Sequence, residues 1–165
     1  MQGRDQLQPG DLVMFRGTGW IARTIMRWTN SPYSHVAMVA AVTPKSVVII
    51  EADRFTQVRV RTIRPDEDVT PYRAHGSYDP AAAVRFAEVF MGMEYDYAQL
   101  LGWAIRRLSK RPATRNLFDT RSRLICSELV DLALWGAGAP RADLPKLGDL
   151  TPGDLFEAYD LRPVM

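Results

Sequence analysis

Cysteine and histidine are scarce in this sequence. Its 165 residues include one cysteine and two histidines. A single cysteine excludes an internal disulfide framework and a cysteine-based zinc cluster. We therefore expect neither a metal nor another cofactor.

Long apolar runs and a strong net charge are also missing. No run approaches the roughly 18 apolar residues that cross a bilayer, and residues 1–8 lack the apolar stretch of a signal peptide. We expect a protein that is not exported by that route and is either cytoplasmic or part of a phage-like particle. The net charge of +2 gives no argument for a nucleic-acid partner. The basic segment 106–123 is either a surface for an anionic partner or a solvated loop.

The length and the hydrophobic fraction of 47% suit one domain, residues 1–165, with a sizeable core. Short apolar or alternating runs predict strands, and apolar residues at helical spacing predict helices. Together they predict an α+β fold, in which an antiparallel sheet of about five strands from roughly the first 75 residues packs against helices from the second half. The expected strands include residues 12–15, 34–42, 47–52 and 58–62, and the expected helices are 19–29, 80–90, 98–109, 126–136 and a short one after residue 152.

Cys126 lies at the start of one of these expected helices. The first turn of a helix has unpaired N–H groups and the positive end of the helix dipole, and both favour a thiolate. A thiolate is the nucleophilic form of cysteine, so a covalent catalyst would be placed here. The alternative is that Cys126 is a small buried hydrophobic residue, and its own surroundings in the sequence leave the two open.

A catalytic cysteine needs a base and a group that orients the base. His75 lies between elements, where a surface position is expected, whereas His35 begins an otherwise apolar strand. If a three-residue turn joins strands 34–42 and 47–52, Glu51 falls diagonally across from His35 on the same sheet face. A shift of one residue would put Glu51 on the other face, so this contact depends on the register.

Two expectations concern side chains outside this group. The arginines in and just after strand 58–62, Arg59, Arg61 and Arg64, form a polar face and are expected to be solvated. Helix 19–29 carries Trp20 and Trp28 at helical spacing, and we expect both to be buried as core anchors. If they were exposed, the helix would instead suit an acyl chain or a bilayer surface.

Six short stretches occur in order along the chain: PGDLV (9–13), SHVAMV (34–39), IEA (50–52), GMEYDY (92–97), CSELV (126–130) and TPGDL (151–155). In this order they resemble the circularly permuted branch of the NlpC-type, papain-like cysteine hydrolases, the YiiX-like group, with lecithin–retinol-acyltransferase-like proteins as more distant kin. The resemblance implies Cys126 as nucleophile, His35 as base and Glu51 as orienting acid. It also implies that Tyr95 lines the active site; the alternative is an aromatic packed on the core.

These residues suggest a thiol-dependent hydrolase that cleaves an amide bond, most naturally in peptidoglycan peptides, through a thioester. The backbone N–H of Ser127 or Cys126 would help to hold the oxyanion. A lipid or acyl substrate is an alternative, as the acyltransferase kin imply. A non-catalytic module of a phage-tail-like assembly is another, and the sequence leaves the oligomeric state open.

Overall fold

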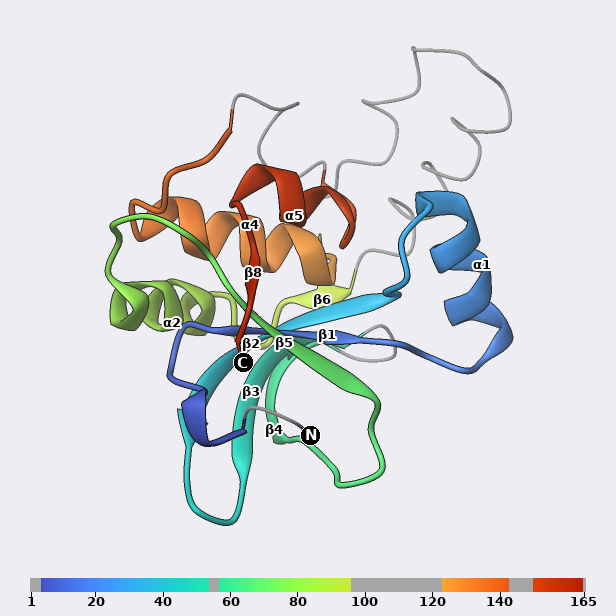
Figure 1. The fold of residues 1–165 in the computed structure, drawn as a ribbon, viewed down its shortest axis with the longest axis horizontal. Coiled ribbons are helices and arrows are strands. Elements are labelled where there is room, and N and C mark those ends of the chain that lie inside the picture. Colours follow the sequence, from blue (N-terminus) through green and yellow to red (C-terminus); the bar gives the residue numbers. More distant parts are fainter. Residues whose placement is uncertain (1–3, 54–56, 96–122, 143–149, 165) are drawn as a thin grey trace.

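The computed structural model describes residues 4–53, 57–95, 123–142 and 150–164 (Figure 1). Its main element is a six-stranded sheet in which every neighbouring pair is antiparallel, in the order β4-β3-β2-β1-β5-β8. The strands are β1 (Leu12–Phe15), β2 (His35–Val42), β3 (Val47–Ala52), β4 (Val58–Thr62), β5 (Val69–Arg73) and β8 (Arg162–Pro163). The predicted α+β class and the five antiparallel strands from the first 75 residues are confirmed. The sixth strand was not predicted, because two residues give no periodic signal.

Four of the expected helices fall within the described residues, close to their expected bounds. They are the 3-10 helix η1 (Arg4–Gln6), α1 (Trp20–Thr29), α2 (Pro80–Val89), α4 (Cys126–Gly136) and α5 (Asp154–Ala158). Asp79 caps α2 by accepting from the Ala81 N–H, and Pro80 follows as the first helical residue. The helix expected at 98–109 and most of the basic segment 106–123 lie outside the described residues. Among the helices that are described, none has the length and apolar character to cross a bilayer.

The sheet has an apolar cluster on each face. Leu12, Val36 and Met38 belong to the cluster that includes the buried residues of α2 and α4, whereas Phe15 and Ala37 belong to the other. Side chains alternate between faces along a strand. His35, which has the parity of Ala37, therefore points to the face away from α2 and α4, where its ring lies 5.3 Å from that of Phe15. Helices α2 and α4 lie in the layer on the opposite face of the sheet (Figure 1).

The register of β2 and β3 is as predicted beside His35 and differs at the turn. Met38 pairs with Ile50, which is the expected register. Val42, however, pairs with Val47 instead of Ser46, and a bulge around Ala40 absorbs the extra residue. The turn is closed by bonds between Thr43 and Ser46: the Thr43 N–H donates to the Ser46 carbonyl, and the Thr43 hydroxyl bonds to the main chain of Ser46.

The prediction that both tryptophans of α1 are buried is wrong for Trp20, whose side chain is 73% exposed. Helix α1 is anchored instead through Ala22, which is 1% exposed. A Cβ at Gly17 would lie 2.5 Å from the Cβ of Ala22, so a residue without a side chain is needed for this approach. Trp20 is the first residue of the helix and lies outside that contact. The side chain of Trp28 is not among those described.

A short parallel pair stands beside the main sheet. It consists of β6 (Glu94–Tyr95) and β7 (Arg123–Leu124), in which Tyr95 pairs with Leu124. The pair joins the end of the α2 region to the residues that precede Cys126, so it fixes where α4 begins.

Candidate active site

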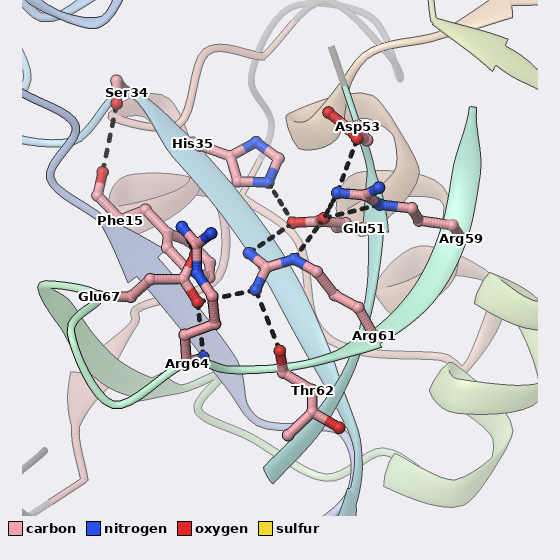
Figure 2. A network of polar contacts seen from close by, with 10 residues as sticks. All are labelled: Phe15, Ser34, His35, Glu51, Asp53, Arg59, Arg61, Thr62, Arg64 and Glu67. Carbon is pink, nitrogen blue, oxygen red and sulfur yellow. Dashed lines mark hydrogen bonds and ion pairs between the residues drawn. The ribbon is translucent and has the colours of Figure 1, made fainter. Parts of the chain in front are cut away.

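His35 and Glu51 meet on the open face of the sheet, at the start of β2 and near the end of β3 (Figure 2). The Nε2 atom of His35 lies 3.0 Å from Oε2 of Glu51. The predicted contact is therefore present, in the diagonal arrangement that the register indicated. Because Glu51 occupies Nε2, the other ring nitrogen, Nδ1, is left for a third group.

That third group is Cys126, the first residue of α4. The side chain of His35 and the backbone N–H groups of Val36 and Ser127 are the hydrogen-bonding groups that act on the pKa of its thiol. The side chain is 5% exposed. Burial alone would raise the pKa of the thiol, but the charge of His35 and these hydrogen bonds outweigh it and lower the pKa.

The pKa of the His35 imidazole shifts in the opposite direction, upward. Burial disfavours its charged form, but the thiolate of Cys126 and then the carboxylate of Glu51 favour it, and together they raise the pKa of His35 to about 10. Both shifts favour the thiolate and the imidazolium over the neutral thiol and the neutral imidazole.

Glu51 is a buried carboxylate, 3% exposed, with two arginines on it. Nε of Arg61 lies 2.6 Å from its Oε1, and Nη2 of Arg59 lies 3.1 Å from the same oxygen. Burial would raise the pKa of Glu51, but the hydrogen bonds from His35 and Arg61 hold it well below its usual range.

The expectation that the arginines are solvated is therefore wrong for Arg61, which is 21% exposed, whereas Arg59 is 42% and Arg64 70% exposed. The register of β3 and β4 pairs Arg59 with Glu51 and Arg61 with Ile49, on the face that carries the carboxylate. Alternation along β4 identified the polar face correctly. It did not show that an acid from the neighbouring strand lies on that face, although extending the predicted register by one strand would have done so.

A cavity of about 630 Å³ lies beside the imidazole. Its lining comes mainly from the loop before α1 and the turn between β4 and β5, and includes Arg16, Thr18, His35, Glu51, Arg64 and Asp68. Cys126 is not part of the lining, because it approaches His35 from the layer of α4. The cavity is thus charged, and it gives access to the imidazole side of the site.

Of the other two predicted site residues, Ser127 follows Cys126 directly, and Tyr95 pairs with Leu124, two residues before Cys126. Ser127 is fully buried and its hydroxyl donates to the Leu150 carbonyl, so only its backbone N–H is directed at the site. Its part in binding an oxyanion stays a prediction. Tyr95 is placed by its pairing with Leu124, two residues before Cys126, and its side chain is not described. His75 is exposed, as expected.

Within the residues that the structure describes, no three or more His, Cys, Asp or Glu side chains are grouped so that they could hold a metal ion.

The pH dependence of Cys126 alkylation tests the ion pair. The rate with iodoacetamide should show an inflection below the free-thiol value of about 8.5. In a His35→Ala variant the inflection should move to higher pH, because the charge of His35 no longer offsets the effect of burial, which raises the pKa of the thiol. A thiol that resists alkylation at every pH in the native protein would show that Cys126 is an inert buried residue.

Replacing Glu51 by Gln should lower the free energy of unfolding at pH 7 by about 2–4 kcal/mol, because two arginines lose a buried carboxylate. Since the pKa of Glu51 is lower in the folded than in the unfolded protein, its contribution is present above its ordinary value, about 4.5, and is lost as the pH falls below it. Urea unfolding from pH 7 to pH 3 should therefore show the two proteins converging. Parallel curves would contradict an ionised Glu51.

Comparison with known proteins identifies a shared fold. No family model and no curated protein matches the chain. Among solved structures, the metalloprotein yiiX from Escherichia coli O157:H7 is similar, with a TM-score of 0.67 and 18% identity over 97% of each chain. The two chains share a fold. The assignment of that fold to the papain-like NlpC type stays a prediction. The permuted chain order and the kinship with lecithin–retinol-acyltransferase-like proteins stay predictions.

Proposed function

We propose that the protein is a cysteine hydrolase that cleaves amide bonds, with Cys126 as nucleophile, His35 as acid and base, and Glu51 as the group that orients His35. The observation that supports this most is the series of groups formed by the thiol, whose pKa His35 lowers, the imidazole, and the buried carboxylate 3.0 Å from it. Such a series has the parts that nucleophilic catalysis requires, namely an activated nucleophile, a base within reach and a partner for the base.

The reaction follows from the charges of these groups. The Cys126 thiolate attacks the amide carbonyl carbon, and the carbonyl electrons move to the oxygen. As the tetrahedral intermediate collapses, the C–N bond breaks, the leaving nitrogen takes the proton of the His35 imidazolium, and a thioester remains on Cys126. Neutral His35 then takes a proton from water, which attacks the thioester, and the thiolate leaves as the carboxylic acid forms.

The lining of the cavity favours a peptide as substrate. Charged groups of both signs, among them Arg16, Arg64, Asp66 and Asp68, surround the space beside His35. A lining of this kind suits a chain that carries its own carboxylates and ammonium groups, as peptidoglycan peptides do, better than an acyl chain. Muropeptides are therefore the substrates to test first.

Intact mass spectrometry after incubation with muropeptides and, separately, with acyl esters tests the proposal. The expected result is release of a new amine from the muropeptide and a transient acyl adduct on Cys126. The Cys126→Ser variant should show no thioester adduct. Turnover that persists in this variant would contradict Cys126 as nucleophile. If neither substrate class reacts, the result would favour the non-catalytic module.

A second candidate, hydrolysis or transfer of an acyl chain at a lipid surface, is favoured by α1. Its first residue, Trp20, is largely exposed, Arg23 and Arg27 are exposed, and the helix has no acidic residue. Half-buried Ile25 also lines the cavity. A helix with exposed aromatic and basic side chains is suited to the interface of an anionic bilayer.

Co-sedimentation with phosphatidylglycerol vesicles distinguishes the two candidates. If α1 binds the bilayer, Trp20→Ala should weaken sedimentation about tenfold, because a large aromatic surface no longer enters the interface. Trp135→Ala is the matched control, because Trp135 is 57% exposed but lies in α4. Absence of sedimentation with the unmodified protein, or equal loss in both variants, would contradict the lipid candidate.

A further inference from the structure

The guanidinium of Arg61 holds both oxygens of Glu51 (Figure 2). Its Nε lies 2.6 Å from Oε1 and its Nη2 lies 3.1 Å from Oε2. Oε2 is the oxygen that contacts Nε2 of His35. A two-point contact of this kind fixes the plane of a carboxylate as well as its position.

We propose that Arg61 is a positioning residue: it keeps Glu51 ionised and turned toward His35, and through Glu51 it sets the protonation of the His35 and Cys126 pair. The inference rests on the proposed function of these three residues. It adds a fourth residue, Arg61, which acts through Glu51 and also belongs to the lining of the cavity.

Arg61 is itself held on several sides. Its Nη1 lies 2.7 Å from Oε2 of Glu67, and that same oxygen accepts the backbone N–H of Arg64 at 2.8 Å. Its guanidinium also lies 5.4 Å from the centre of the Phe15 ring, which in turn lies beside His35. Fixed by the carboxylate of Glu67 and the ring of Phe15, Arg61 loses little further freedom when it binds Glu51.

Arg59 has a different role, although it also contacts Glu51. Its Nε and Nη2 lie 3.2 and 3.1 Å from Oε1, the oxygen that His35 does not contact. Arg59 is 42% exposed and is shared with Asp53, whose Oδ2 lies 2.7 Å from its Nη2. Arg61 is only 21% exposed and contacts both oxygens, so Arg61 should have the larger effect on the orientation of the carboxylate.

The charges around Glu51 and His35 come from several elements. They are Cys126 from α4, Arg59 and Arg61 from β4, Asp53 after β3, Arg64 and Glu67 from the turn after β4, and, across the cavity, Arg16, Asp66 and Asp68. Asp53 and Glu67 offset the two arginines that contact Glu51. Loss of one arginine therefore leaves the carboxylate beside two other acids.

The consequence is a defined change in pH dependence. Without Arg61, the buried carboxyl of Glu51 should take up a proton at a higher pH than before. A neutral Glu51 no longer stabilises the imidazolium, so the pair shifts from thiolate and imidazolium toward neutral thiol and imidazole. The acid limb, which is the pH range over which thiolate reactivity rises as the Cys126 thiol loses its proton, should then move to higher pH.

Alkylation of Cys126 by iodoacetamide between pH 4 and pH 9 measures this limb without a substrate. In Arg61→Met the limb should move upward by about one pH unit. Arg61→Lys keeps the charge but loses the two-point contact, and should give a smaller shift. Arg73→Met is the matched control, because Arg73 makes a similar two-point contact, 2.6 and 2.8 Å, with Asp11 at a distance from His35. Its limb should coincide with that of the unmodified protein.

A second measurement separates positioning from general destabilisation. In a Glu51→Gln background, Arg61→Met should add no further shift, because the residue through which Arg61 acts is gone. The imidazole NMR signals can be followed directly, since the chain has two histidines and His75→Gln identifies the other one.

The outcomes are distinct. If the unmodified protein shows no inflection below the free-thiol value, the proposed function fails, whatever Arg61 does. If that inflection is present but Arg61→Met leaves it in place, or Arg73→Met shifts it equally, the role of Arg61 is overturned. The same holds if Arg61→Met shifts it fully in the Glu51→Gln background. If Arg61→Met does not fold, the Arg61→Lys variant is used instead. The role of Arg61 is overturned if this variant has the same acid limb and the same His35 imidazole signal as the unmodified protein.

Discussion

The burial of one carboxylate is the constraint on which the site depends. Glu51 is 3% exposed, and a lone ionised carboxyl at that depth would take up a proton. It remains ionised because an imidazole and two guanidinium groups surround it. The same burial makes the carboxylate useful to His35, since a charge that is shielded from water acts strongly on its neighbour. The contacts of Glu51 with His35, Arg59 and Arg61 therefore connect strands β2, β3 and β4 and also orient the imidazole.

The contributing residues come from three consecutive antiparallel strands and one distant helix. Antiparallel pairing aligns His35, Glu51 and Arg61 across β2, β3 and β4, so these three depend only on local hairpins. Cys126 depends on the long-range packing of α4 against β2. The base and its partners can form early from nearby sequence, whereas the nucleophile joins them only when the two layers pack.

Much of this arrangement could be predicted from the sequence, and the exceptions have physical reasons. The period of two in residues 34–52 placed Glu51 on the face of His35, and helical spacing after residue 126 placed Cys126 at a helix start. Alternation identifies a polar face but not what lies on it, so Arg61 was assigned to solvent. Helical spacing identifies an apolar stripe but not the element that covers it, so Trp20 was assigned to the core. The fold expected from the six stretches is the one shared with yiiX.

The bulge at Ala40 separates the hairpin into two parts that can vary independently. Beyond it, the residues near the turn follow one register; before it, Met38 and the strand leading to His35 follow another. A change in the length of the turn can be taken up at residue 40 without rotating the side chains that face Glu51. The loop between β2 and β3 is therefore a position at which related chains can gain or lose a residue while the geometry around the imidazole is preserved.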